Sequence, residues 1–163
     1  YKELGANTTL DYGCGQQTVK AALAKQGIRV AGYDPGIPEK AAMPKPHDLV
    51  VCTEVMEHVE YSQLEKVLAH INSVALKGAF FTISCDHAGE ILADGRNAHL
   101  IVEEPTWWIA KMQQWDNWYV HKQHVDIQKK RVYIWIVKKS TSLGAQPQTS
   151  PDDERRDQRH QAD

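Results

Sequence analysis

The stretch Leu10-Asp11-Tyr12-Gly13-Cys14-Gly15 decides the fold, because it joins a short apolar run to a glycine turn. Residues 8–12 are predicted to form a strand, and apolar residues at helical spacing from position 19 to position 23 predict a helix that stops near Gly27. A glycine turn between a strand and a helix lets a ligand approach the backbone and meet the free N–H groups of the helix N-terminus. The sequence therefore predicts a ligand-binding turn at residues 11–15.

Further strands and helices alternate along the rest of the chain. Strands are expected at residues 29–33, 49–52, 79–84, 118–126 and 131–137, and helices within residues 55–74 and from Pro105 onward. Because the first strands are almost continuously apolar, we predict an α/β fold with a Rossmann-like, mostly parallel sheet covered on both faces. The last two strands are predicted to form a C-terminal antiparallel hairpin. Four prolines in residues 35–46 predict a shortened, extended connector after the second strand.

Composition limits the domain organisation and the cellular location. The 163 residues, 42% of them hydrophobic, suffice for one domain, which we expect at residues 1–139, followed by a disordered polar tail at residues 140–163. No apolar stretch approaches the roughly 20 residues of a membrane span, so no membrane partner is expected. Three cysteines without paired spacing suit a reducing, cytoplasmic compartment. The net charge of -2 gives no overall attraction for nucleic acid, and the oligomeric state stays open.

An acidic residue at the end of the second predicted strand narrows the ligand class. Asp34 lies 23 residues after Asp11, where a carboxylate can accept both hydroxyl groups of an adenosine ribose. Thr18 occupies the place of the third glycine in the dinucleotide pattern, which makes the dinucleotide fit poor. Asp11 would repel a pyrophosphate, whereas it would attract the ammonium and sulfonium charges of S-adenosylmethionine. The charges therefore favour the methyl donor.

Residues 10–15, 32–35 and 48–52 together resemble the successive motifs of class I S-adenosylmethionine-dependent methyltransferases, and the similarity extends over residues 8–138. The resemblance implies an S-adenosylmethionine site whose residues come from these motifs. The predicted cofactor-binding residues are Asp11, Gly13, Cys14 and Gly15, with Asp34 and Pro35 at the ribose and Cys52 and Thr53 beside the sulfonium. Gln17 departs from the family pattern of small residues in the loop. The proline-rich connector replaces the helix and strand that normally contact adenine, so no adenine ligand is predicted.

A second group of polar residues follows the third predicted strand. Glu54, Glu57 and His58 stand at relative positions 0, 3 and 4, and on one helical turn these side chains would share a face. They would lie at the carboxyl end of a parallel strand, where open α/β sheets place their ligands. Such a group can bind a divalent metal, act as a general base, or form hydrogen bonds to neighbouring loops. The last possibility carries weight, because many class I methyltransferases have a Glu-His pair here and use no metal.

The Glu-x-x-Glu-His run is also similar to that of the small-RNA 3′-terminal 2′-O-methyltransferases, whose metal site adds one later histidine. This resemblance implies that Glu54, Glu57, His58 and His99 bind Mg²⁺ or Mn²⁺, with His87 as the competitor of His99. The catalytic candidates are Glu57, His58 and His99. Methyl transfer needs an acceptor that is relieved of its proton, and either a metal or a histidine can meet this need.

The acceptor itself is left open by the sequence, with an RNA end, a small molecule or a sugar as candidates. Arg96 and Asn97 are possible acceptor contacts, and one of Trp107 and Trp108 could stack on a base. Basic residues flank the predicted hairpin and could touch phosphate: Lys129, Lys130, Arg131, Lys138 and Lys139. Each candidate has a structural alternative. Arg96 and Asn97 could lie in a solvated turn, the tryptophan could belong to the core, and the basic residues could lie at a solvated hairpin tip. A non-catalytic binding protein of the same fold is the alternative from another functional class.

Overall fold

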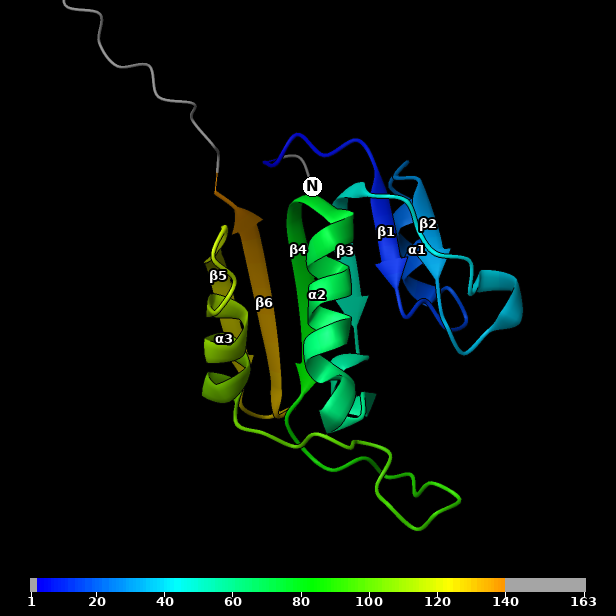
Figure 1. Ribbon diagram of the computed structural model, residues 1–163, viewed down its shortest axis with the longest axis vertical. Coiled ribbons are helices and arrows are strands. Elements are labelled where there is room, and N and C mark those ends of the chain that lie inside the picture. Colours follow the sequence, from blue (N-terminus) through cyan, green and yellow to red (C-terminus); the bar gives the residue numbers. More distant parts are fainter. Residues whose placement is uncertain (1–2, 140–163) are drawn as a thin grey trace, which may run out of the picture.

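One six-stranded sheet organises residues 3–139, the part of the chain that the computed structural model describes, and its strand order is β2-β1-β3-β4-β6-β5 (Figure 1). The strands are β1 (Thr9–Tyr12), β2 (Val30–Tyr33), β3 (His47–Thr53), β4 (Ala75–Ser84), β5 (Trp118–Asp126) and β6 (Arg131–Lys138). The first four strands in this order pair in parallel, while β6 is antiparallel to both β4 and β5. The predicted Rossmann-like, mostly parallel sheet with a C-terminal antiparallel hairpin is confirmed. The tail predicted at residues 140–163 lies outside the described residues.

Two helices cover one face of the sheet and build the hydrophobic core. They are α2 (Leu64–Val74) and α3 (Pro105–Gln113), which lie side by side in front of the strands in Figure 1. Apolar residues recur along α2 with the helical period, so that one stripe of the helix packs against the sheet. Trp108 and Met112 do the same on α3. The predicted start of a helix at Pro105 is confirmed, since proline fits the first helical position.

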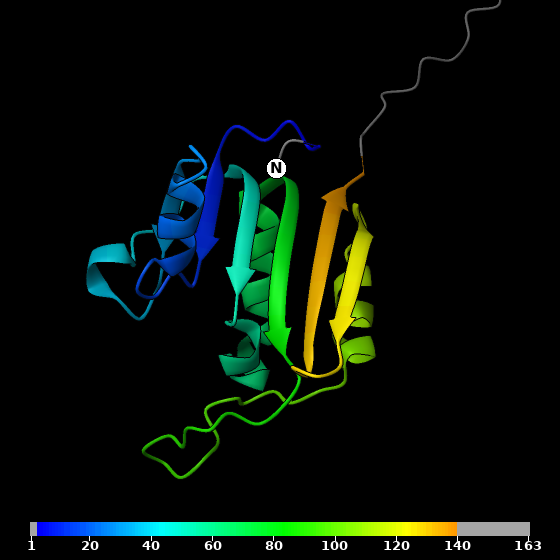
Figure 2. The same cartoon turned by 180° about the vertical axis from the view of Figure 1, so that it is seen from behind.

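The opposite face of the sheet is only partly covered by the described residues. Within residues 3–139 the helix on this face is α1 (Thr18–Ala24), which lies near β1 and β2 and has no buried residue. Strands β3, β4, β6 and β5 show their bare side in Figure 2. A groove of about 750 Å³ results, with apolar side chains such as Leu49, Phe80 and Trp135 in its walls. The expectation of a sheet covered on both faces is therefore met only in part over residues 3–139, because α1 covers β1 and β2 but not the other strands.

The connector after β2 contains little regular structure. Residues 34–46 hold only one turn of 3-10 helix, η1 (Pro38–Lys40), which agrees with the predicted extended connector. Prolines lack the N–H group that a crossover helix or a central strand would use. Strand β2 is consequently the edge of the sheet. None of the helices in residues 3–139 has both the length and the apolar character needed to cross a bilayer.

The segment between β3 and α2 is less regular than the sequence predicts. It contains two short 3-10 helices, η2 (Met56–His58) and η3 (Tyr61–Gln63), before α2 begins. Glu54, directly before them, has a left-handed backbone with φ of 53°. An α-helix cannot continue through such a residue, so the expected helical face that Glu54 shares with Glu57 does not form.

Candidate active site

The carboxyl ends of the parallel strands meet at one edge of the sheet, which lies at the bottom of Figure 1. The glycine loop after β1 starts here. The backbone N–H groups of Gly13 and Cys14 both donate to the carbonyl oxygen of Tyr33, at 2.8 and 3.0 Å, so the loop is fastened to the end of β2. Gly13 and Gly15 have φ of 75° and 41°, a backbone region that suits glycine. Gln17, which departs from the family pattern, also has a positive φ of 62°.

Asp34 faces the loop from the end of β2. Its Oδ2 accepts a hydrogen bond from the N–H group of Gly15 and its Oδ1 accepts one from Gly36, both at 2.9 Å. Each carboxylate oxygen can accept a second hydrogen bond. Asp34 is therefore oriented by the backbone and keeps acceptor capacity for two hydroxyl groups of a ribose. Pro35 lies exposed in the turn that follows.

Asp11 is a buried carboxylate without a full set of partners. The residue is 1% exposed, and its Oδ2 has no hydrogen-bond partner. Burial, with a further contribution from the charge of Asp34, raises the pKa of Asp11 to about 6, while Lys40 acts in the opposite direction. A buried carboxylate in this state gains from a cationic ligand nearby. The ammonium or sulfonium group of a methyl donor has this charge.

Lys40 belongs to the same site, although the sequence analysis did not identify it. Its Nζ donates to the carbonyl oxygen of Gly15 at 2.5 Å, and the carbonyl of Lys40 accepts from the N–H group of Asp34 at 3.1 Å. The connector thus places one ammonium group beside two carboxylates. No motif marks this lysine, because its position depends on how the proline-rich segment folds back onto the loop.

The remaining predicted cofactor residues differ in their exposure. Cys14 and Cys52 are buried, and burial raises the pKa of both thiols, so they pack as neutral groups. Cys14 packs closely against Gly32, since a Cβ atom added to Gly32 would lie 2.9 Å from the sulfur of Cys14. Cys52 belongs to the core under the helices, whereas Thr53 lines the groove on the opposite face.

Glu57 is the buried acid of a second site at this edge. The residue is 0% exposed, and its Oε1 accepts the N–H group of Ser84 at 2.9 Å while its Oε2 has no partner. Burial raises the pKa of the Glu57 carboxyl. A buried polar atom without a partner is unusual in proteins and indicates a missing proton, water or ligand.

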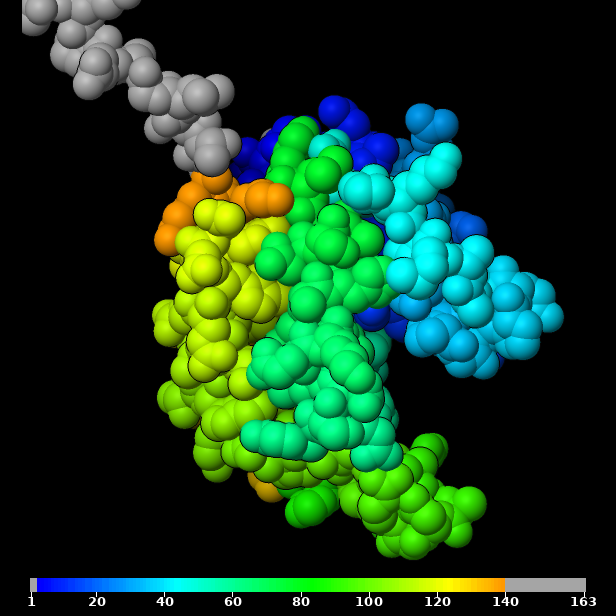
Figure 3. Space-filling model, viewed as in Figure 1, coloured from blue at the N-terminus to red at the C-terminus, as the bar shows by residue number. Residues whose placement is uncertain are grey.

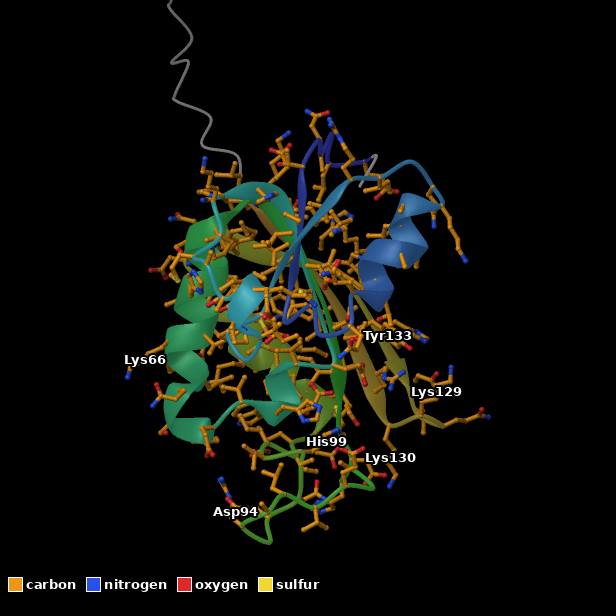
Figure 4. All side chains as sticks on the ribbon, turned by 90° about the vertical axis from the view of Figure 1, so that its right-hand side faces the viewer. Lys66, Asp94, His99, Lys129, Lys130 and Tyr133 are labelled. Carbon is orange, nitrogen blue, oxygen red and sulfur yellow. The ribbon has the colours of Figure 1, made fainter. Side chains whose placement is uncertain are left out.

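Two histidines converge on Glu57, and we call Glu57, His58 and His99 the cluster. Nδ1 of His58 lies 2.9 Å from the carbonyl oxygen of Ala98, and Nδ1 of His99 lies 2.5 Å from that of Asp86. Because a carbonyl can only accept, each neutral ring carries its proton on Nδ1 and leaves the lone pair of Nε2 free. One ligand atom from each of the three residues lies within 4.8 Å of the others. Figure 4 shows His99 at the base of a long loop, close to Lys130.

Glu54 and His87, two other candidates for this cluster, lie elsewhere. Glu54 accepts hydrogen bonds from Thr82 Oγ1 and Arg131 Nη2, both at 2.8 Å, and is not among the residues that converge. Its left-handed backbone interrupts the helical turn that Glu54 was expected to share with Glu57. His87 is exposed, and the structure brings His99 to the cluster in its place.

The candidate acceptor contacts are engaged within the protein. Arg96 pairs with Glu60 and Asp94, with oxygen distances of 2.8 and 2.7 Å from Nη2. Asn97 forms hydrogen bonds with Ala88 and His99. These contacts stabilise the loop that projects from the molecule in Figure 3.

The aromatic and basic candidates also have partners. Trp108 is fully buried in the core, while Trp107 is half-buried and its ring centroid lies 6.4 Å from that of Tyr61. At the hairpin turn, each basic side chain is paired with a carboxylate: Lys129 with Asp126, Lys130 with Asp86, and Arg131 with Glu54. The part of the chain that the structure describes thus has no unpaired basic group at this turn.

Fold and site together define the class of the protein. A sheet of this order with a glycine loop after β1 and an acidic residue after β2 is that of a class I S-adenosylmethionine-dependent methyltransferase. Residues 3–140 match a family described as methyltransferase domain, and the chain belongs to this family. No curated protein sequence matches the chain.

Solved structures of the same fold include enzymes with different acceptors. The mitomycin 7-O-methyltransferase MmcR superposes with a TM-score of 0.64 at 13% identity, over 85% of this chain, which spans only 50% of the length of MmcR. Magnesium protoporphyrin IX methyltransferase from Synechocystis PCC 6803, with bound S-adenosylhomocysteine, superposes with a TM-score of 0.61 at 16% identity. The match covers 80% of this chain and 73% of that enzyme's chain. The methyltransferase domain of bacterial CtHen1 superposes with a TM-score of 0.58 at 13% identity, over 84% of this chain and 92% of that domain.

Proposed function

We propose that this protein transfers the methyl group of S-adenosylmethionine to a hydroxyl oxygen, assisted by a divalent metal held by Glu57, His58 and His99. The observation that carries the proposal is that Glu57, His58 and His99 bring one ligand atom each to within 4.8 Å of the others. Oε2 of Glu57 has no partner, and the backbone leaves Nε2 of both histidines free to bind. The cluster lies at the same edge of the sheet as the cofactor loop. A methyl donor and a deprotonated acceptor can therefore meet there.

The cluster has the chemistry of a metal site. Metal-binding histidines commonly donate their second ring N–H group to a carbonyl or carboxylate, as both histidines do here. Two imidazoles with one carboxylate suit Mn²⁺ better than Mg²⁺, which prefers oxygen ligands and water. Three protein ligands would leave positions for the acceptor. A bound divalent cation lowers the pKa of a hydroxyl group that it touches.

The protein's own residues would hold the donor at the glycine loop. The Asp11 carboxylate faces the cationic methionine part, the glycines of the loop let the ligand approach the backbone, and Asp34 accepts the ribose hydroxyls. Cys14 and Pro35 support the loop and the turn, and the backbone at Cys52 and Thr53, at the end of β3, would lie beside the sulfonium. The fastening of the loop to Tyr33 preorganises this arrangement.

For the acceptor, a ribose hydroxyl at an RNA end is the first candidate. It is supported by the Glu-x-x-Glu-His run and by the structural likeness to the methyltransferase domain of bacterial CtHen1. A small molecule or sugar is the second candidate. It is favoured by the ion pairs at the hairpin turn, since Lys130 and Arg131 already have carboxylate partners and offer less attraction to phosphate.

Calorimetric titration and a methyl-transfer assay test this function. We expect the protein to bind S-adenosylmethionine, and to bind Mn²⁺ more tightly than Mg²⁺. Radiolabelled methyl groups should then pass to one of four fractions: RNA, DNA, protein or small metabolites. Periodate-treated RNA, which lacks the terminal diol, is the control for a 3′-terminal ribose. Failure to bind the donor would refute the enzymatic proposal, and metal binding that is unaffected by Glu57→Gln would refute the role of the cluster.

A further inference from the structure

The geometry points to Asn97 as a positioning residue that holds His99 in place within the cluster. The inference rests on the proposed function only for the metal-binding role of the cluster, because the hydrogen bonds that hold His99 are independent of that role. Residues 86–99 form a long loop, which we call the arm, and its tip near Asp94 projects away from the sheet in Figure 4. Asn97 lies at the neck of the arm, two residues before His99.

One side chain closes the neck with three hydrogen bonds. Oδ1 of Asn97 accepts from the N–H groups of Ala88 and His99, and Nδ2 of Asn97 donates to the carbonyl oxygen of Ala88, all at 2.9 Å. The side-chain amide adds to the backbone hydrogen bonds across the arm, which join Ala98 to Glu90 at 3.0 Å and Leu92 to Arg96 at 2.8 Å. It joins the segment that carries His99 to the segment that begins at Asp86.

This cross-link determines where the imidazole of His99 lies. The ring is held by Asp86 on one end of the arm, while the backbone of His99 belongs to the other end. Asn97 is the side chain that joins these two ends next to the histidine, through Ala88 and the backbone of His99. The neighbouring residue, Ala98, supplies the carbonyl that holds the ring of His58. Both imidazoles of the cluster therefore depend on the backbone that Asn97 holds.

The hydrogen-bonding capacity of Asn97 argues against a role in contacting the acceptor. An asparagine side chain can accept two hydrogen bonds and donate two. Both acceptor positions and one donor are already used within the arm. A single N–H group remains, which is too little for specific recognition of an acceptor and is consistent with a role in positioning.

The arm has a second fastening that serves as a matched control. Arg96 pairs with Glu60 beyond His58, through two hydrogen bonds of 3.0 and 2.8 Å. These exposed contacts hold the arm from outside and do not reach His99. Replacing Arg96 removes a comparable number of hydrogen bonds from the same arm, so it separates general loosening of the arm from the specific action of Asn97.

The test compares Asn97→Ala, Asn97→Asp and Arg96→Ala by two readouts. The first is the ¹⁵N spectrum of the histidine side chains in the metal-free protein, which reports which ring nitrogen carries the proton. The second is the affinity for Mn²⁺ in calorimetry. For Asn97→Ala we expect His99 to lose its single tautomer. Mn²⁺ binding should weaken by about 10–100-fold, which is typical when a residue that holds a metal ligand by hydrogen bonds is removed.

The other variants sharpen the test. Asn97→Asp keeps both acceptor contacts, so the His99 tautomer should be retained, and Arg96→Ala should leave both readouts near those of the parent protein. The affinity for S-adenosylmethionine should be unchanged in all three, which shows that they fold. An unchanged His99 spectrum in a folded Asn97→Ala protein would overturn the inference. If the parent protein fails to bind Mn²⁺, the proposed function falls, while the His99 spectrum still decides the role of Asn97.

Discussion

Val55 fills the space directly in front of Gly13: a Cβ atom on Gly13 would lie 2.4 Å from Cγ2 of Val55. The cofactor loop after β1 and the turn after β3 are thus in contact, and only glycine fits between them. This contact joins the two loops at the carboxyl edge of the sheet. The effect of this contact on stability and donor binding can be separated by mutation from the effect of the positive φ of Gly13.

We predict that Gly13→Ala abolishes binding of S-adenosylmethionine and destabilises the fold. Alanine adds the collision with Val55 to the cost of a left-handed backbone, which is about 1–2 kcal/mol. Gly27→Ala is the control, because Gly27 has φ of 74° and no atom within 4 Å of the added Cβ. Urea unfolding should show a loss in both variants, larger for Gly13→Ala. Equal donor affinity in the two variants would contradict the prediction.

Donor binding should depend on pH through Asp11. Because the pKa of Asp11 is raised to about 6, its carboxylate is charged at pH 7 and largely neutral at pH 5. If the charged form binds the cationic donor, the affinity falls below pH 6, by up to about tenfold per pH unit. Calorimetry at pH 7, 6 and 5 measures this decline. Asp11→Asn should bind weakly at each pH, and a parent protein with a flat profile would exclude this role of Asp11.

Lys40 should set the position of this pH profile. Its charge lowers the pKa of Asp11, so in Lys40→Met the pKa of Asp11 moves above about 6 and the decline in donor affinity begins at higher pH. Lys40→Arg keeps the charge and should keep the profile of the parent protein. The measurement is the same pH series of donor titrations. Identical profiles for the methionine and arginine variants would show that the charge of Lys40 has no part in binding.

The two glutamates after β3 should differ in their effect on metal binding. Glu57→Gln removes a ligand of the cluster, and we expect Mn²⁺ affinity to fall by more than the roughly 10–100-fold typical of outer partners. Glu54→Gln leaves the cluster intact and alters only the contacts with Thr82 and Arg131, so Mn²⁺ affinity should stay within about threefold. Calorimetric titration of both variants provides the comparison. A larger loss in Glu54→Gln than in Glu57→Gln would reverse the assignment.

Local sequence patterns were sufficient for much of the fold. The proline at position 105 marks a helix start and the apolar alternation after position 131 marks a hairpin strand, because both signals act within a few residues. The glycine loop and Asp34 are likewise marked by motifs in short segments. The prolines of the connector were enough to predict the absence of a regular crossover, since proline excludes itself from helix interiors and central strands.

Features that depend on contacts between residues far apart in the sequence could not be predicted from local patterns. A helical face over residues 54–58 was expected, but the positive φ of Glu54 and the short η2 helix separate its members. Cover for the second face of the sheet is a property of the whole chain, and strand patterns alone do not supply it. The place of Lys40 depends on the path of the connector, and the partners of Asn97 depend on the closure of the arm.

The left-handed backbone at Glu54 has a consequence for attempts to make the protein more heat-resistant. Glycine at this position would relieve the strain and by itself favour the native state. The same change would remove the carboxylate that joins three neighbouring strands, through Thr82 on β4 and Arg131 on β6. The strain at Glu54 and the contacts of its carboxylate therefore belong together: the backbone energy that glycine would recover is offset by the loss of the hydrogen bonds that hold the three strands at this edge.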